Sequence, residues 1–347
     1  MAAEQNKKRK PLWLKVLLVI LVIILLLLLG GYLLLNHYLS KMQYEPDDTI
    51  VIQSTEYMEN TEEESYEGTN SPEEDIKQAD DELESHLAET EDNSSVSGNV
   101  TNILLIGVDR RDSSWNGNSD SMILVSINND TKKVILTSIM RDTYVSIPGV
   151  KNYKINHAMA VGGANLLLET VRQNFKVQVD YYACVDFNAF KGVVDVFGTI
   201  PVTLTQAEID TFGSQLDKFQ REGNVYYLDS TFALSYARNR WIGRWDYERT
   251  ERQRKIILSL VGCLKNSSLS EINDVANAVL PNVSHNIPQT ELLKLLMNAV
   301  TYLNYDMVSS RIPYDGMYQS MTIEGQGMLV PDWNATINQL YNTIYGK

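Results

Sequence analysis

The chain has 347 residues, a net charge of −14 and two cysteines, which indicates one sizeable domain with appendages and excludes a cysteine-based metal site. The charge is uneven: residues 41–99 hold 19 acidic residues against Lys41 and Lys77, whereas residues 100–347 hold 24 acidic and 23 basic residues. The folded part is therefore nearly neutral and has no overall field for capturing nucleic acid, so any anion site must be a local cluster.

An apolar run extends from Val16 to Leu35 and is interrupted only by Gly30, Gly31 and Tyr32. A helix of about twenty such residues crosses a bilayer core of roughly 30 Å. A cleaved signal peptide is the alternative, but its apolar core is shorter, roughly 7–15 residues, and a small-x-small site follows it. Because the basic cluster Lys7-Lys8-Arg9-Lys10 precedes the run, we predict a single-pass cell-membrane anchor over 16–35, a cytoplasmic stub over 1–15 and an extracellular C-terminal domain.

Residues 36–99 are rich in Glu, Asp, Ser and Asn and poor in large apolar side chains. Such a composition cannot bury enough surface to offset chain entropy, so it predicts an acidic, disordered extracytoplasmic linker. A short helix starting at Ser71-Pro72-Glu73-Glu74 and running toward Leu87 is an open alternative. The linker either gives the domain reach from the membrane or is a tolerated spacer.

The domain is predicted over residues 100–347. Apolar runs that end in Gly, Asp or Asn indicate strands, and longer periodic segments indicate helices packed on a central sheet. Strands are predicted at 102–109, 122–127, 134–139 and 181–187, the second and third joined as a hairpin. Helices are predicted at 156–175, 188–197, 230–236, 248–264, 291–303 and 332–345. Cys184 and Cys263 are compatible with one disulfide or with separate core positions.

Two acidic residues follow or begin predicted strands. Asp109 ends the first strand and Asp120 opens the second, so neighbouring strands place both carboxylates at the same end of the sheet. Two carboxylates a few Å apart repel one another, and a hard cation such as Mg²⁺ relieves that repulsion. The alternative is that each aspartate forms a turn.

Basic residues gather in two later segments. Arg141 follows the third strand, with Lys154 soon after it. From Arg238 to Lys255 there are seven basic and three acidic residues, and arginine forks match phosphate oxygens in pairs. A solvated helix face is the alternative, which we expect for Arg252, Arg254 and Lys255. No Walker-type phosphate loop is present in the sequence.

In their order and spacing these motifs resemble the LytR-CpsA-Psr family of bacterial cell-wall ligases, with a motif core over residues 102–255. The matching segments are Asn102-Ile-Leu-Leu-Ile-Gly-Val-Asp109, Ser119-Asp120-Ser-Met, Ser138-Ile-Met-Arg141-Asp-Thr-Tyr, Lys154-Ile-Asn-His157-Ala, Asp180-Tyr-Tyr, Val185-Asp186-Phe, Ala237-Arg238-Asn-Arg240 and Arg249-Thr-Glu-Arg-Gln253. The resemblance implies an α/β three-layer sandwich, with a central mixed β-sheet flanked by helices and an apolar cavity for a lipid tail.

The resemblance also implies an activity. Such proteins move a glycopolymer from an undecaprenyl-pyrophosphate carrier to peptidoglycan, forming a phosphodiester, as in teichoic acid or capsule attachment. The anchor then keeps the enzyme in the plane of the carrier lipid, with the diphosphate at headgroup level. A regulatory protein that binds the lipid without turnover is one alternative, and a lipid pyrophosphatase is another.

The family's site residues carry over to matching positions. Asp109 and Asp120 are expected to hold Mg²⁺, and the catalytic set is Asp109, Arg141, Arg238 and Arg240, with Asp109 also accepting the proton of the attacking hydroxyl. The diphosphate is expected to contact Arg141, Lys154, Arg238, Arg240, Arg249 and Gln253. Two positions depart from the pattern: Asn118 stands where the family usually has Arg, and Glu248 stands where a small residue is common. Arg110, Arg111 or Arg244 are candidates to offset the missing guanidinium.

Overall fold

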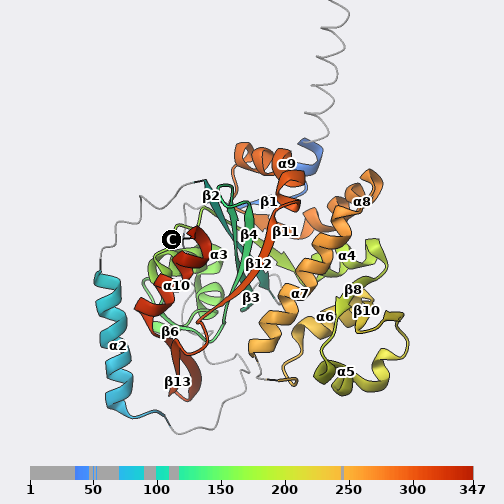
Figure 1. The fold of residues 1–347 in the computed structure, drawn as a ribbon. Helices are drawn as coiled ribbons and strands as arrows, with labels where there is room; N and C mark the ends of the chain where they lie inside the picture. The colour runs from blue at the N-terminus through green and yellow to red at the C-terminus, as the bar shows by residue number, and fades with distance from the viewer. Residues whose placement is uncertain are drawn as a thin grey trace, which may run out of the picture.

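The computed structural model describes residues 36–46, 50, 52, 70–89, 99–108, 117–243 and 246–346. At its centre lies a seven-stranded mixed sheet (Figure 1). In spatial order its strands are β1 (Gln43–Tyr44), β11 (Val283–His285), β7 (Tyr181–Asp186), β2 (Val100–Val108), β3 (Ser119–Asn128), β4 (Lys133–Ile139) and β12 (Asp306–Ile312). The four predicted strands and the predicted hairpin are confirmed, because β3 and β4 pair antiparallel.

The strand directions define the two ends of the sheet. β2 and β4 are both antiparallel to β3, β7 is parallel to β2, and β12 is parallel to β4. The carboxyl ends of β2, β4, β7 and β12 therefore lie at the same end as the start of β3. Loops that leave this end bring side chains from distant parts of the sequence together, as expected for ligand sites in open α/β sheets.

Helices cover both faces of the sheet, so the predicted α/β arrangement with flanking helices is confirmed (Figure 1). One face packs against α3 (His157–Phe175) and α10 (Trp333–Tyr345) through a core that includes Leu104, Leu124 and Leu340. The other face meets α7 (Asp246–Lys265) and α9 (Gln289–Leu303) around Ile123 and Leu136. Two small pairings of strands accompany the main sheet: β5 (Tyr144–Ser146) with β6 (Asn152–Lys154), and β13 (Tyr318–Ile323) with β14 (Gln326–Pro331).

A lobe with its own core packs beside the sheet. Its elements are α4 (Phe187–Phe197), β8 (Ile200–Thr203), α5 (Gln206–Phe212), η3 (Gly213–Leu216), β9 (Arg221–Glu222), β10 (Val225–Leu228) and α6 (Ser230–Arg238), with α8 (Leu269–Val279) against α4 and a short η4 (Leu280–Asn282) after it. Tyr236, Leu228 and Val194 are fully buried there. Cys263 packs on this lobe whereas Cys184 lies in the main core, and the two form no disulfide.

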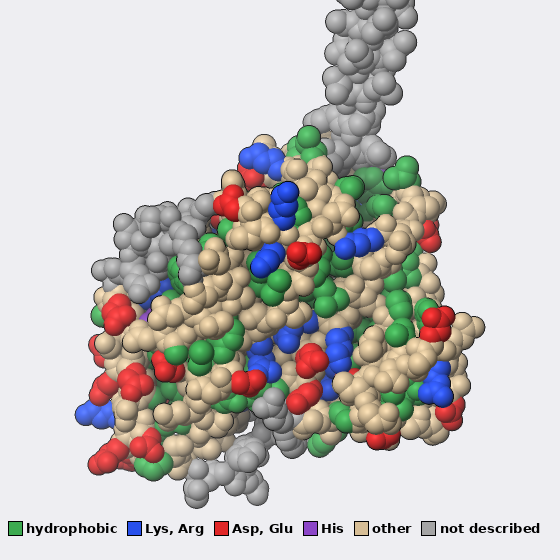
Figure 2. Space-filling view, viewed as in Figure 1, with side chains coloured by type: hydrophobic (Ala, Val, Ile, Leu, Met, Phe, Trp, Pro, Cys, Tyr) green, Lys and Arg blue, Asp and Glu red, His purple; other side chains and the backbone are tan. Residues whose placement is uncertain are grey.

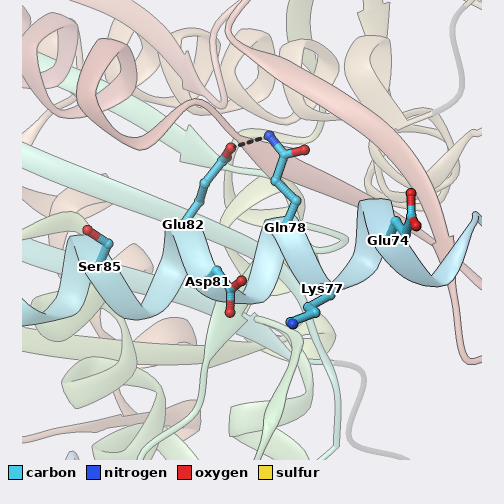
Figure 3. A pocket seen from close by; sticks show the side chains of 6 residues that line it. All are labelled: Glu74, Lys77, Gln78, Asp81, Glu82 and Ser85. Atoms are coloured by element: carbon cyan, nitrogen blue, oxygen red, sulfur yellow. Dashed lines mark hydrogen bonds between the residues drawn. The ribbon is translucent and has the colours of Figure 1, made fainter.

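Within residues 70–89 of the expected linker, the alternative of a short helix is confirmed. Glu73–Ala88 forms helix α2, which buries Ala79, Leu83 and His86 against the main core. This spacing of four and three residues places all three on one helix face, so a short apolar stripe suffices to dock an otherwise acidic segment. The outer face is polar, with Gln78 donating to Glu82 Oε1 at 2.7 Å (Figure 3).

Residues 36–46 also belong to the folded domain. β1 pairs parallel with β11, and Tyr182 Oη donates to Glu45 Oε2 at 3.0 Å. Tyr38 and Lys41 donate hydrogen bonds to Asn273 and Asn277 of α8. The predicted membrane span, residues 16–35, lies outside the described residues, and none of the described helices is both long and apolar enough to cross a bilayer.

Helix α7 does not present Arg252 and Arg254 to solvent, so the expectation of a solvated face is wrong for both. Arg252 is 1 % exposed, lies 3.5 Å from Glu208 Oε1 and donates to the Asn239 carbonyl at 2.5 Å. Arg254 is 7 % exposed and donates to Ser138 Oγ at 2.6 Å. Burial, and then the nearby Arg311 charge, lower the pKa of Arg254 to about 10, so it remains protonated at neutral pH.

Replacing Leu83 tests the docking of α2. Leu83→Ala removes a side chain that is 1 % exposed, so we expect the free energy of unfolding to fall by about 2–4 kcal/mol in urea titration. Glu84→Ala, on the exposed side of the same helix, should change it by less than about 0.5 kcal/mol. Equal, small effects of both variants would contradict the docking.

The two buried arginines of α7 should differ in their contribution to stability. Arg252→Met removes one of the two cations that pair with the buried Glu208 carboxylate and leaves Lys255 and the hydrogen bonds from Tyr236 and Thr205, and we expect a loss of about 3 kcal/mol. Arg254→Met removes a buried cation whose charge is opposed by Arg311, so we expect stability to stay the same or rise. Urea unfolding of both variants measures the difference, and a larger loss for Arg254→Met would overturn this account of α7.

Candidate functional site

The candidate site is built at the carboxyl end of the sheet, where β2 and β3 approach closely. A Cβ added to Gly107 would lie 3.0 Å from the Ser121 Cβ, so a larger residue here would require the Ser121 side chain to shift by a few tenths of an ångström. The β2–β3 register shifts between Gly107 and Val108, and such a bulge redirects the residues that follow. Asp109, the predicted metal ligand and base at this point, lies outside the described residues.

Three guanidinium groups converge on one oxygen of Asp120, the second residue of β3. Arg141 Nη1, Arg240 Nη2 and Arg249 Nη1 lie 3.4, 3.6 and 3.9 Å from Asp120 Oδ1. The Arg249 side chain is 3 % exposed and that of Asp120 is 25 % exposed, so the group is partly shielded from water. Figure 2 shows basic and acidic side chains gathered in the middle of this face.

In the described part of the chain, these three guanidinium ions pair with two carboxylates, Asp120 and, at Arg141, Asp142. Guanidinium ions held this close repel one another, and an anion that lies among them relieves the repulsion. Each planar guanidinium offers paired N–H donors that match phosphate oxygens. The arrangement is therefore complementary to a multiply charged phosphate group, and the prediction that Arg141, Arg240 and Arg249 lie together is consistent with the geometry.

The segment that carries Arg141 is held in place by ion pairs with neighbouring residues. Asp142 lies 3.6 Å from Arg141 Nε and 3.0 Å from Lys154 Nζ. Lys154 is nearly buried and also donates to Gln326 Oε1 at 3.1 Å. The structure pairs the ammonium of Lys154, a predicted contact of the diphosphate, with Asp142, which also faces Arg141 Nε.

Arg252 fixes the turn that carries Arg240. After α6 ends at Arg238, Asn239 is extended and its side chain accepts from the Trp241 N–H at 3.0 Å. Arg252 of α7 donates a hydrogen bond to the Asn239 carbonyl, and this bond ties the turn that carries Arg240 to α7. The role of Arg252 was missed in the sequence because its partner Glu208 is distant along the chain and only the fold brings them together.

Two other predicted residues lie beside this group. The Arg238 guanidinium is stacked over the Phe187 ring at 4.6 Å, a cation–π contact. Gln253 follows Arg249 by one turn of α7, and its half-buried side chain forms no hydrogen bond with any residue that the structure describes. Arg238 lies two residues before Arg240 in the sequence, and Gln253 lies four residues after Arg249.

The two departures from the family pattern have different structural settings. Asn118 is half-buried and directly precedes β3, so a neutral amide stands beside Asp120. Its candidate substitutes Arg110, Arg111 and Arg244 all lie outside the described residues. Glu248 folds against Gly243, whose φ is +79° and where an added Cβ would meet the Glu248 side chain at 2.6 Å. Glu248 therefore packs under this loop.

An apolar layer extends from the site between the sheet and helices α7 and α9. Ile123 and Leu136 are buried there, but the residues packed on them keep part of their surface exposed. These partly buried residues are Leu105, Val125, Ile257, Leu258, Leu295, Tyr302, Tyr305 and Met307. A Cβ added to Gly262 of α7 would meet no atom within 4 Å. These side chains give the layer a partly exposed apolar surface, which is the kind of surface that an apolar ligand contacts.

Comparison with curated proteins gives relatives of one kind. The polyisoprenyl-teichoic acid–peptidoglycan teichoic acid transferase TagU of Oceanobacillus iheyensis is 37% identical over 207 residues, which cover 57% of this chain and 62% of that protein. The protein of the same name from Bacillus cereus strain AH820 is 33% identical over 246 residues, covering 68% of this chain and 78% of that protein. The match to the first of these thus spans less than two thirds of its length.

Solved structures share the fold. Protein gbs0355 from Streptococcus agalactiae superposes with a TM-score of 0.59 at 27% identity, covering 74% of this chain and 91% of that one. The LytR-CPS2A-psr family protein YwtF (TagT), with bound octaprenyl pyrophosphate lipid, gives a TM-score of 0.54 at 22% identity and covers 75% and 95%. The model of the LytR_cpsA_psr family matches residues 57–341, and the chain therefore belongs to that family.

Proposed function

We propose that this protein is a membrane-anchored phosphotransferase that moves a glycopolymer from a polyprenyl-diphosphate carrier to peptidoglycan. The observation that carries the proposal is the convergence of Arg141, Arg240 and Arg249 on Asp120 Oδ1. Phosphoryl transfer requires little covalent chemistry from a protein and depends on positioning and on neutralising charge at the non-bridging oxygens. Three preorganised guanidinium groups supply both.

The diphosphate is proposed to take the place that Asp120 now holds among the arginines. Arg141 and Arg249 are largely buried, so their donors are already oriented before the substrate arrives. The polyprenyl chain would lie in the apolar layer between the sheet and α7. A lipid whose charged head and apolar tail both find complementary surfaces in one continuous site fits this geometry better than a soluble phosphate ester does.

Asp120 also fits a role in holding Mg²⁺. All three guanidinium contacts fall on Oδ1, and within the described residues no hydrogen bond or ion pair reaches Oδ2. The described part of the chain contains no cluster of three or more acidic, His or Cys side chains. Mg²⁺ commonly takes one or two carboxylates, substrate phosphate oxygens and waters, so Asp120 with Asp109 would suffice. The ion would neutralise charge that develops on the diphosphate.

The proposed reaction forms one bond and breaks another. An acceptor hydroxyl of peptidoglycan attacks the phosphorus that carries the glycan, the bond from that phosphorus to the bridging oxygen breaks, and polyprenyl phosphate leaves. The hydroxyl proton passes to a carboxylate, for which we propose Asp109. Arg238, held over Phe187 next to Arg240, is proposed as a further contact to the diphosphate, and Gln253 as a hydrogen-bond donor.

Several observations support the wider assignment. The curated relatives carry the name of teichoic acid transferases acting on peptidoglycan, and one structure of the same fold holds octaprenyl pyrophosphate. The apolar run at 16–35, preceded by basic residues 7–10, supports a single-pass anchor with a cytoplasmic N-terminus and an extracellular domain. We propose that the acceptor is peptidoglycan and that nucleic acid is not a partner.

Removing single arginines tests the transfer. In the full-length chain in vesicles, Arg240→Ala and Arg249→Ala should each lower glycopolymer transfer to peptidoglycan by about 10²–10³-fold, because each deletes a preorganised donor. Arg221→Ala, an exposed arginine of β9, serves as the control and should leave transfer unchanged. If the wild-type protein releases polyprenyl phosphate but attaches no glycopolymer to peptidoglycan, it is a pyrophosphatase. If it binds the lipid and forms neither product, it is a regulatory protein.

Neutralising Asp120 tests its competition with the diphosphate. In metal-depleted buffer, Asp120→Asn should bind inorganic pyrophosphate several-fold more tightly, a gain on the order of 1 kcal/mol, because the competing carboxylate is gone. The same variant should lose any increase in affinity caused by added Mg²⁺. Isothermal titration calorimetry measures both effects, with Asp217→Asn at an exposed position as the control. Weaker pyrophosphate binding by Asp120→Asn without metal would argue against the competition.

A further inference from the structure

Exposed apolar side chains concentrate on helices α8 and α9, which lie at the same end of the molecule (Figure 1). Of nine large hydrophobic residues that are exposed in the described parts of the chain, five lie on α8 and α9. We call this set the α8–α9 apolar face, and its members are Leu269, Ile272, Leu296, Met297 and Val300. Met297 is 83% exposed and Leu269 is 87% exposed, which is unusual for side chains of this size in contact with water.

Helix α9 is apolar on more than its inner side. Leu295 and Tyr302 point to the apolar layer over the sheet, whereas Leu296, Met297 and Val300 are exposed on the outer side. A surface helix of a water-soluble domain normally carries polar residues there. No residue of α9 is fully buried. The helix is therefore built to meet apolar surroundings on both sides.

The described end of the N-terminal segment lies between these two helices. Gln289, the first residue of α9, donates to Asn36 Oδ1 at 3.4 Å. Tyr38 and Lys41 donate to Asn273 and Asn277 of α8. Figure 1 shows α9, α8 and this segment at the same end of the molecule. Asn36 directly follows the apolar run that ends at Leu35, so the proposed membrane span enters the domain beside the α8–α9 apolar face.

We propose that the α8–α9 apolar face rests on the lipid bilayer and fixes the orientation of the domain on the membrane. The proposal rests on the membrane anchor of the proposed function and goes beyond it, because an anchor alone allows the domain to swing. Charged residues of both signs border the α8–α9 apolar face on α9, where Lys294 pairs with Glu291 at 2.7 Å. The affinity therefore comes from buried apolar area, with the Lys294 and Lys265 ammonium groups reaching toward headgroups.

This orientation directs the site away from the membrane. Helix α7 begins at the site near Arg249 and ends at Lys265 beside Leu269, a span of about 24 Å at the usual helical rise. The apolar layer connects the two ends and is bounded by α9. A polyprenyl chain could enter the layer from the bilayer without crossing water, while its diphosphate head lies at the far end, facing the acceptor.

Depth-dependent quenching tests the contact directly. The full-length chain carries Cys263→Ala, which leaves only the buried Cys184, and a fluorescent label at Met297→Cys. It is reconstituted in vesicles of phosphatidylethanolamine and phosphatidylglycerol containing doxyl-labelled lipid. We expect the doxyl lipid to quench this label and aqueous iodide to leave it bright. The same label at Gln215→Cys, an exposed position of η3, should show the opposite behaviour.

The outcomes separate the possible occupants of the face. Quenching of both labels by iodide and of neither by doxyl lipid would overturn the proposal. Protection of the Met297 label from both quenchers would also overturn it, because a second copy of the chain or another protein would then cover the face.

A charged variant links the contact to transfer. Met297→Asp with Val300→Asp should abolish doxyl quenching of a label at Leu269→Cys and lower transfer from a bilayer-held donor several-fold. Transfer from a detergent-solubilised donor should remain unchanged, because the site itself is intact. Equal transfer from both donors would contradict the proposal. The quenching result does not depend on turnover, so failure of the proposed transfer activity would be recognised separately.

Discussion

The Asp120 carboxylate holds three guanidinium groups that would otherwise repel one another, and each comes from a separate segment of the chain. Arg141 follows β4, Arg240 follows α6 and Arg249 lies in the first turns of α7. Holding them together requires the sheet to bring β3 and β4 side by side and requires α7 to cross their ends. The buried Arg252 and the Asp142–Lys154 pair secure these segments. The fold therefore positions three positively charged side chains close together, and an anionic diphosphate is a ligand that such a cluster attracts.

The acidic segment before the domain contacts the domain at the two places that the structure describes. Residues 36–46 lie on the β11 edge and α8, and helix α2 packs on the opposite side of the sheet through Ala79, Leu83 and His86. The segment thus folds along the domain at both described places. In the orientation that we propose, the diphosphate lies away from the headgroups, since α7, which carries Arg249 in its first turns, begins at the end of the molecule away from α9 (Figure 1). The apolar layer beside α7 provides a path between these two ends.

The sequence predicted what depends on local pattern. The strands at 102–109, 122–127 and 134–139 appear as β2, β3 and β4, because apolar runs punctuated by Gly, Asn and Asp leave few alternatives. The motif order also predicted which arginines share a site. Partnerships between distant residues were not predictable: His86 Nε2 donates to the Asn174 carbonyl and the ring stacks on Trp333, and only tertiary packing reveals this. Arg252 and Arg254 look like solvated helix residues for the same reason, since their partners Glu208 and Ser138 lie far away along the chain.

The most direct test of the central claim is a crystal structure of the full-length chain with Mg²⁺ and a polyprenyl diphosphate. The account requires the diphosphate oxygens to lie within hydrogen-bonding distance of Arg141, Arg240 and Arg249, with Asp120 Oδ1 displaced from them and the polyprenyl chain along the sheet beside α7. A diphosphate bound elsewhere, with the three contacts to Asp120 intact, would contradict it.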